Sequence, residues 1–464
     1  MGIMRFLFLS VLLLVTGVDE CLAQPPSTQP PSRVTQRPKK PRDPKCEPPP
    51  AAAADAHDPV VSAPPSTRPA ISETPAPGAV TVPAPVVPTP MPVQGCADDD
   101  VNLPAKMKKF QSEHPEVVKT FMRMNTTLPG WTLRMDTIID GSGIAGGIAY
   151  RHEVVEEKAS FDMMGMLSIN AYYLVTAGMT YARKSDQRLV FHAAMRHESF
   201  PKEDFYGFGR NTRAEDHTEY WRQAFDSVGG VTFSPTRTIH VTGTAGILDV
   251  RMLSGLGGGK PSTEDRFSPD DVPGLHPGMW SNYLHAGAGI DIDRTDDLLF
   301  PKGGRYRGSF TRYRGIGDAD GLFSRVDIDI RQYYPLPYAS NQVLAARVLL
   351  MSVSAQDPNA VPFYFLPRLG GSTTMRSYDT SRLSDHDALG MNLEYRVRLN
   401  RLQVLGLVDL GDVAPSLGEL RPSKFHTATG AGVRFLAGGT FLPGVDVAHG
   451  SEGWAVIVRL GHAF

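Results

Sequence analysis

The sequence predicts an all-β chain that forms a transmembrane antiparallel β-barrel of about 16 strands. Three observations support this prediction: an amino-terminal export signal, no later apolar stretch long enough for a membrane-spanning helix, and short alternating segments from residue 130 to the end. A mean hydropathy of −0.20 agrees with a barrel, because its strands alternate lipid-facing and interior-facing residues. The net charge of −2 gives no basic footprint for nucleic acid, so no nucleic-acid partner is expected.

Residues 1–23 have the organisation of a signal peptide. Arg5 supplies the positive charge, Phe6–Gly17 forms a short apolar core, and small residues precede a cleavage site before Gln24. The apolar core is too short to span a bilayer. We therefore expect an exported chain that retains two cysteines, Cys46 and Cys96. In an oxidising compartment a disulfide and two separate thiols are both compatible with the sequence.

Two further segments precede the predicted barrel. Residues 24–97 are dense in proline and hold no aromatic residue, which predicts a disordered, semi-stiff tether. In the periplasm this tether is expected to reach a partner protein or the cell wall. Residues 98–128 predict a short helical linker with Pro115 in its first turn, and residues 104–124 fit either a plug of the barrel or an ordinary connector.

Residues 129–464 alternate with the period of two that is typical of strands. In the segment 390–399, Asn392, Glu394 and Arg396 share one face, while Leu393 and Tyr395 lie on the other. Residues 325–331 repeat the pattern, with acidic and basic side chains mixed on the polar face. A soluble sandwich also alternates, but mixed charges suit an enclosed interior, and about 16 segments fit an even-numbered barrel.

The connections between these segments differ in length. Tight links are expected at residues 400–401 and 438–440, whereas long polar links are expected at 355–385 and 415–425. Short turns on the periplasmic side and long loops outside are the asymmetry of bacterial outer-membrane barrels. In the last predicted strand, Trp454 and Phe464 are spaced by about the length of one spanning strand, which suggests the two aromatic girdles at the membrane interfaces.

Several motifs resemble those of the BamA/TamA-type outer-membrane β-barrel superfamily, also known as the bacterial surface antigen family. The C-terminal residues Arg459, Gly461 and Phe464 resemble the β-signal that outer-membrane insertion machinery reads. The segment with Gly370, Gly371, Met375, Arg376, Ser377 and Tyr378 resembles the family's Gly-Gly…Val-Arg-Gly-Phe/Tyr loop. Residues 392–396 and 408–413 resemble its next two strands, Asp293, Arg294, Pro301 and Gly304 its turn motif, and residues 205–209 a common outer-loop motif.

The resemblance implies an ionic contact between three of these residues. In the family the loop folds back into the lumen, and its arginine pairs with acidic residues on the next two strands. Carried over, Arg376 would pair with Glu394 and Asp409, and parity places Glu394 on the polar face of its strand. The alternative is that each charge is simply solvated in a wet channel. Ser377 replaces the usual glycine and is expected to adopt backbone angles that glycine adopts more easily.

The sequence leaves three functions open. The first is insertion or translocation of protein or lipid through a lumen closed by the arginine loop; the second is a structural or surface-antigen barrel, and the third is a passive pore for small solutes. Relatives that insert or secrete proteins carry periplasmic repeat modules, and residues 24–128 hold no such repeat. Catalytic elbows, zinc motifs and phosphate loops are not found, so we expect no enzyme, metal or cofactor. The expected surroundings are outer-membrane lipid and, during biogenesis, the insertion machinery.

Overall fold

The computed structural model describes residues 130–464, except 156–158, 184–185, 257–258, 297–299, 318, 320, 337–338 and 436–442. The signal peptide, the proline-rich tether, the helical linker, both cysteines and the link at 438–440 lie outside the described residues. Within them, one 16-stranded antiparallel sheet follows chain order, which confirms the predicted fold class and strand number. No described helix is long and apolar enough to cross a membrane.

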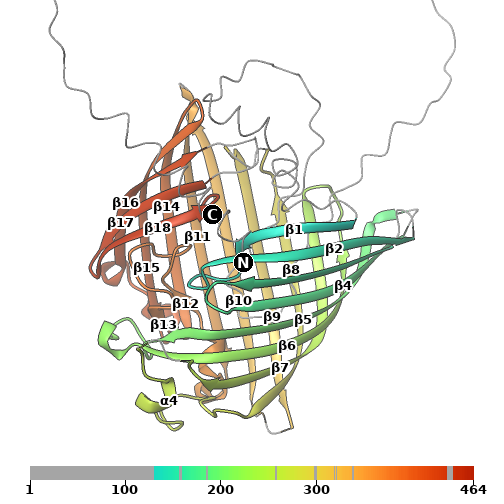
Figure 1. The fold of residues 1–464 in the computed structure, drawn as a ribbon, viewed down its shortest axis with the longest axis vertical. Coiled ribbons are helices and arrows are strands. Elements are labelled where there is room, and N and C mark those ends of the chain that lie inside the picture. Colours follow the sequence, from blue (N-terminus) through green and yellow to red (C-terminus); the bar gives the residue numbers. More distant parts are fainter. Residues whose placement is uncertain are drawn as a thin grey trace, which may run out of the picture. The chain divides into compact units, whose positions relative to one another are not determined.

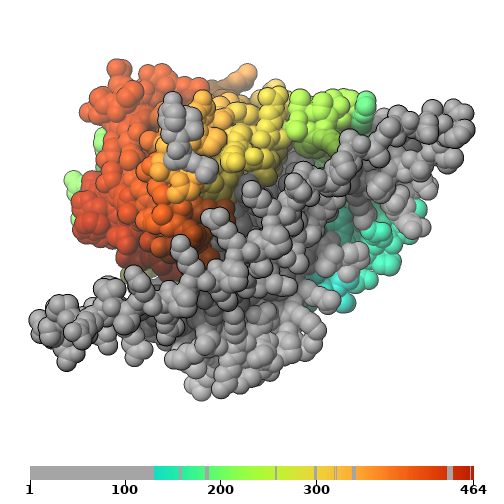
Figure 2. All heavy atoms as spheres, turned by 90° about the horizontal axis from the view of Figure 1, so that it is seen from above, coloured from blue at the N-terminus to red at the C-terminus, as the bar shows by residue number. Residues whose placement is uncertain are grey.

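Every strand of the large sheet pairs with its neighbours in the chain, apart from the small excursion of β12 and β13. Figure 1 shows the strands following one another in sequence order, and the colours on the surface in Figure 2 pass from green through yellow and orange to red in the same order. The strands are β1 (Gly130–Thr137), β2 (Ile144–Val155), β3 (Ala159–Ser168), β4 (Tyr173–Arg183), β5 (Asp186–Phe205), β6 (Thr218–Phe233), β7 (Ile239–Ser254), β8 (Trp280–Asp293), β9 (Gly303–Ile316), β10 (Leu322–Leu336), β11 (Ala339–Ala355), β14 (Asp387–Leu399), β15 (Leu402–Ala414), β16 (His426–Phe435), β17 (Pro443–Gly450) and β18 (Gly453–Leu460), with β12 (Arg368–Leu369) and β13 (Leu383–Ser384) forming a separate pair and α4 spanning Thr263–Arg266.

The two faces of the sheet differ as parity predicts. On β14, Leu393 and Tyr395 are each 43% exposed, whereas Glu394 and Arg396 are fully buried. We call the face with buried polar side chains the inner face and the face with exposed apolar side chains the outer face. The outer face suits lipid, because hydrocarbon accepts apolar side chains and excludes charges.

Charges on the inner face are paired rather than simply solvated. On β10 and β11, Asp329 accepts hydrogen bonds from Arg331 and Arg347, and the closest N–O distances are 2.6 Å and 3.0 Å. Arg325 binds Asp327 at 2.8 Å in the same region. These pairs use the residues whose mixed charges predicted an enclosed interior, and buried charges require such partners.

The connections are asymmetric, as expected. At one end of the sheet, a tight turn joins β14 and β15, and its Asn400 has a φ of 55°. At the other end, a two-residue turn joins β17 and β18. The long connections all lie at the end opposite the 400–401 turn. Each follows an odd-numbered strand of the large sheet, whereas the 400–401 turn follows the twelfth. These connections are 206–217, 255–279, 356–386 and 415–425. The sheet thus has a short-turn end and a long-loop end, and α4 lies at the latter (Figure 1).

One prediction about the chain's last residues is wrong. Trp454 is 74% exposed on the outer face, but Phe464 is only 6% exposed and does not belong to an outer aromatic girdle. β18 ends at Leu460, and Gly461 adopts a φ of 121°, which turns the chain off the strand. The guanidinium of Arg396 then lies 5.3 Å from the centre of the Phe464 ring. Phe464 therefore packs on the inner face, where cation–π attraction and burial hold it.

Candidate functional site

The loop between β11 and β14 folds onto the inner face of the sheet. Its turn begins at Gly370 and Gly371, which have φ angles of 126° and 80°. The N–H of Gly371 donates to the carbonyl of Tyr378 at 3.0 Å, so the segment 370–378 closes on itself. Because L side chains rarely adopt such φ angles, the paired glycines explain how the chain reverses here.

Arg376 lies at the tip of this closed turn and is 1% exposed. Its Nε and Nη2 donate to the two oxygens of Asp409 at 2.8 Å and 2.6 Å, and its backbone N–H donates to Asp409 at 3.1 Å. Nη1 donates to Glu394. One guanidinium thus joins carboxylates on β14 and β15, a geometry that a planar five-donor group suits well.

The contacts of Arg376 continue into a wider ionic cluster. Arg396 donates to the second oxygen of Glu394 at 2.8 Å, and Asn392 donates to Asp409 at 2.8 Å. Asp446 on β17 binds Arg434 at 2.5 Å and Arg459 at 2.9 Å. All of these side chains except Arg459, which is intermediate, are nearly fully buried, so each charge depends on its neighbours for compensation.

Glycines on the strands make room for the turn. A Cβ added at Gly411 on β15 would lie 2.7 Å from Met375 Sδ, and one added at Gly450 on β17 would lie 2.7 Å from the carbonyl oxygen of Thr427 and also too close to Ser377. Met375 and Ser377 flank Arg376, so these glycines permit the close approach that the arginine contacts require.

We expect Gly450→Ala to displace the turn without removing any charge. The added methyl group would meet the Thr427 carbonyl, which as backbone cannot move aside, so the free energy of unfolding should fall by about 1–3 kcal/mol. Urea denaturation followed by heat-modifiable gel mobility measures this loss. Gly406→Ala on β15 is the matched control, since nothing lies within 4 Å of its added Cβ. Equal stability of both variants would contradict this account.

The expectation for the backbone of Ser377 is wrong. Ser377 is not among the described non-glycine residues with positive φ, which are Ala171, Ser381 and Asn400. A serine therefore fits its position without strain. Tyr378, the next residue, is 4% exposed, and its hydroxyl lies 2.9 Å from Ser451 Oγ in the turn between β17 and β18.

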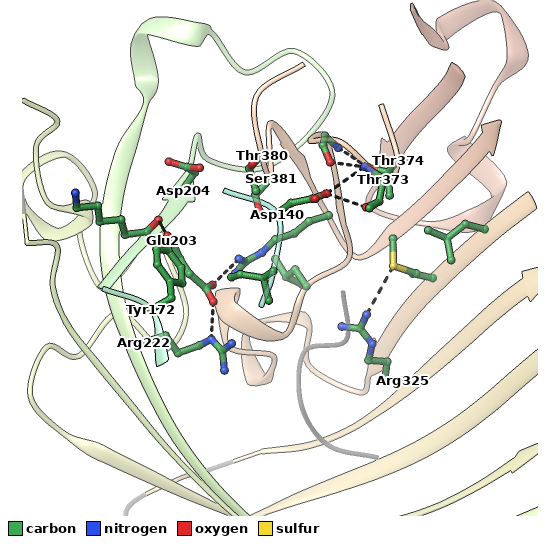
Figure 3. A pocket seen from close by; sticks show the side chains of 17 residues that line it. Asp140, Tyr172, Glu203, Asp204, Arg222, Arg325, Thr373, Thr374, Thr380 and Ser381 are labelled. Carbon is green, nitrogen blue, oxygen red and sulfur yellow. Dashed lines mark hydrogen bonds and ion pairs between the residues drawn. The ribbon is translucent and has the colours of Figure 1, made fainter. Parts of the chain in front are cut away.

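The loop also contacts the first hairpin of the sheet. Asp140, in the connection between β1 and β2, accepts hydrogen bonds from Ser372 at 2.5 Å and from Thr373 at 2.8 Å, as Figure 3 shows for the threonine. The carbonyl of the same Ser372 accepts a hydrogen bond from Arg459 of β18 at 2.7 Å. A single loop residue therefore contacts the turn after the first strand and the last strand of the sheet.

A cavity beside Asp140 has a volume of about 60 Å³. Tyr172, Glu203, Arg222 and Thr373 are among its lining residues (Figure 3). A water molecule needs about 10–15 Å³ of such space, so this volume holds a few water molecules. The cavity is thus too small for a polypeptide or a lipid, and the loop contacts form the stronger candidate for a functional site.

An aromatic cluster occupies the inner face next to the loop. Phe363, Tyr364 and Phe365 form a short 3-10 helix and are each at most 2% exposed. The Phe365 ring lies 4.9 Å from that of Phe323 and 5.0 Å from that of Tyr313, measured between centroids. This helix lies within the link that was predicted to be polar, at 355–385, and was not predicted. Its run of three aromatics is the signal that could have revealed it.

The remaining predicted residues lie at the ends of strands. Asp293 ends β8 and accepts a hydrogen bond from the backbone N–H of Thr295 at 3.0 Å, while Arg294 donates its N–H to the carbonyl of Gly304 at 2.9 Å. Pro301 is buried in the same turn. Arg459 joins the ionic cluster through Asp446. Gly461 turns the chain off the strand, and the Phe464 carbonyl accepts a hydrogen bond from Arg396 of the cluster at 3.4 Å. Asp140 and Asp446 were not predicted, and Arg396 was predicted only to lie on the polar face of its strand; for Asp446, parity with neighbouring inner residues was the available signal.

Comparison with known proteins bears on this arrangement. Residues 190–437, more than half of the chain, match the model of the Omp85 superfamily domain. The chain belongs to the Omp85 superfamily. It is an outer-membrane β-barrel, and the resemblance to BamA/TamA-type barrels is confirmed at the level of the superfamily. Among curated proteins, no match to this sequence was found.

Solved structures resemble this Omp85 barrel in fold. BamA from Haemophilus ducreyi lacking POTRA domains 1–3 is 12% identical with a TM-score of 0.53, covering 72% of this chain and 69% of that chain. CdiB from Acinetobacter baumannii is 11% identical with a TM-score of 0.43, covering 71% and 58%, and CdiB from Escherichia coli is 12% identical with a TM-score of 0.45, covering 72% and 63%. At such identities the likeness to BamA describes the fold alone.

Proposed function

We propose that this Omp85 barrel assists the insertion or translocation of polypeptide at the outer membrane, through a seam between β1 and β18 that the Arg376 loop controls. Ser372 carries the proposal, because it contacts the Asp140 turn beside β1 and Arg459 on β18. Among the described residues, β1 and β18 are the two edges of the sheet. An unpaired edge offers its backbone N–H and C=O groups to an incoming strand.

The ionic cluster supports a role for the loop as a lock of the lumen. Arg376 binds strands β14 and β15, while Ser372 and Thr373, a few residues earlier, reach the first hairpin and β18. A shift of this segment would thus alter contacts with both edges at once. Breaking a buried ion pair leaves an uncompensated charge, which is strongly destabilising. We therefore expect the loop to move between two distinct states rather than through a continuum.

The inner packing favours this function over a passive pore. The aromatic cluster around Phe363 and Phe365 covers the inner face at the long-loop ends of β6 to β11 with apolar side chains. Water and ions avoid such a region. A structural or surface-antigen barrel remains the alternative, in which the same contacts only hold the barrel together.

A cross-link across the seam tests the proposal. Leu133→Cys on β1 and Val456→Cys on β18, joined by a bifunctional thiol reagent, would fix the seam, with Cys46 and Cys96 replaced by serine in every variant. We expect the protein without the cross-link, placed in liposomes, to accelerate the folding of an unfolded outer-membrane barrel. The cross-linked protein should lose that acceleration.

The matched control joins strands that are already paired. Val447 lies directly opposite Val456 in the register of β17 and β18, so Val447→Cys with Val456→Cys forms a cross-link away from the seam. This variant should keep its activity. Full activity of both cross-linked proteins would rule out opening at the seam. Absence of any acceleration by the uncross-linked protein would favour the structural alternative.

The proposal also covers the proline-rich segment that precedes the barrel. We infer that residues 24–97 extend into the periplasm and bind a partner protein or the cell wall, since proline-rich chains span distance without a packed core. Outer-membrane lipid surrounds the barrel, and the terminal Arg459, Gly461 and Phe464 serve as the signal for the insertion machinery before folding. Cross-linking in outer membranes followed by purification identifies the partner.

A further inference from the structure

Two carboxylates face each other at the long-loop end of the hairpin formed by β5 and β6. Asp204 and Glu219 are direct partners in the register of these strands. Like charges directly opposite each other in an antiparallel pair are destabilising. His217, at the end of the connecting loop, lies between them in sequence, and its Nε2 is 2.6 Å from Asp204 Oδ1.

The three side chains offer donor atoms at one place. One nitrogen of His217 and one oxygen each of Asp204 and Glu219 all lie within 4.8 Å of one another. A Zn²⁺ ion bound to donors at about 2.0–2.2 Å requires separations of about 3–3.5 Å between them. These separations fall between the 2.6 Å contact and the 4.8 Å limit, so small side-chain rotations suffice.

An orphaned atom points to a missing partner. Glu219 Oε2 is buried and has no hydrogen-bond partner among the described residues. A buried carboxylate oxygen without a partner is costly. The nearby arginines do not supply one, because Arg222 and Arg368 bind Glu203 on the other side of β5. Figure 3 shows the Asp204 side chain apart from the Glu203–Arg222 pair.

The geometry points to a binding site for a divalent transition-metal ion of the Zn²⁺ class, held by Asp204, His217 and Glu219. Two carboxylates and one imidazole leave a fourth position for water, as in open zinc sites. The His217 and Asp204 side chains are 13% and 20% exposed, so an ion can reach them from the long-loop end.

The surroundings hold the imidazole in place. The Tyr206 ring stacks on the His217 ring with centroids 4.4 Å apart and an angle of 22°. The Tyr206 hydroxyl donates to Asp379 of the inner loop at 3.1 Å. An ion at this site would therefore brace the β5–β6 hairpin, which also pairs with the loop through Gly209 and Ser384. Such supporting contacts fix the orientation of metal ligands.

Metal binding by the purified full-length barrel tests the site. The protein is untagged, stripped with chelator and carries serine in place of Cys46 and Cys96, so that no thiol or tag binds the ion. Titration with Zn²⁺, followed by calorimetry and by metal analysis after dialysis, should give one ion per chain. X-ray absorption should show nitrogen and oxygen neighbours at about 2.0–2.1 Å, including one imidazole, and no sulfur.

Variants separate this site from incidental binding. His217→Ala, Asp204→Asn and Glu219→Gln should each weaken Zn²⁺ binding by about 100-fold, at or beyond the upper range for loss of supporting contacts. His276→Ala, in the exposed loop before β8, is the matched control and should bind as the parent does. Heat-modifiable mobility verifies that every variant folds, and Glu219→Gln keeps the shape of the site if others fail.

Three results would overturn the inference. They are no Zn²⁺ bound by the folded parent protein, equal binding by the parent and the three ligand variants, or binding of Ca²⁺ and Mg²⁺ in place of Zn²⁺. The last would indicate an oxygen-only site elsewhere, since those ions prefer oxygen ligands. None of these results depends on whether the barrel inserts polypeptides.

Discussion

Replacing Arg376 by alanine is expected to destabilise the barrel by about 3–5 kcal/mol, because two buried carboxylates would lose their shared partner. Glu394 and Asp409 both have no exposed surface, so water cannot replace the guanidinium without opening the structure. The midpoint of urea unfolding, followed by heat-modifiable gel mobility, should fall accordingly. Single-channel conductance should rise, since the turn would no longer be fixed to β14 and β15.

The controls for this prediction use the same strand and the same charge. Arg398→Ala removes an arginine from β14 that is exposed and donates only a long hydrogen bond of 3.4 Å to Asn400, so stability should change little. Asp409→Arg should be as harmful as Arg376→Ala. Adding Arg376→Asp to it should restore part of the stability, although Glu394 would then repel the new carboxylate. Unchanged folding and conductance of Arg376→Ala would show that the contact is not structural.

The second large effect is expected from the aromatic cluster. Phe365→Ala should destabilise the barrel by about 3–5 kcal/mol, because the side chain is 1% exposed and its removal leaves a cavity among rings. Replacing Phe363, Tyr364 and Phe365 together should also raise conductance in planar bilayers, since a dry region of the inner face would become accessible to water.

Substitution of an aromatic residue on the outer face is the control, because it removes a ring without disturbing the packing of the inner aromatic cluster. Phe310 on β9 is 46% exposed and lies where lipid surrounds the sheet. Phe310→Ala should change stability less than Phe365→Ala and should leave conductance unchanged. Conductance of the triple variant equal to that of the parent protein would mean that the Phe363–Phe365 segment does not close the interior.

The faces of individual strands could be predicted from the sequence, because alternation depends only on residues that are adjacent in the chain. Alternation in 390–399 predicted which side of β14 would hold Glu394, and mixed charges in 325–331 predicted an enclosed face. The long polar segment at residues 355–385 predicted the long connection after β11. By contrast, Phe464 was assigned to the outer face by spacing alone, and the kink at Gly461 made that assignment wrong.

The sequence by itself determined the strand number, the two faces and the residues that resemble the Omp85 loop, since parity and motifs depend on adjacent positions. Only the tertiary structure decided which distant residues meet: Ser372 with Asp140 and Arg459, Phe365 with Tyr313 and Phe323, and Asp204 with His217 and Glu219. The first two sets of contacts join parts of the chain that are far apart in sequence, and the third joins side chains of one hairpin. They depend on the curvature of the sheet and the path of its loops, which no period of two encodes.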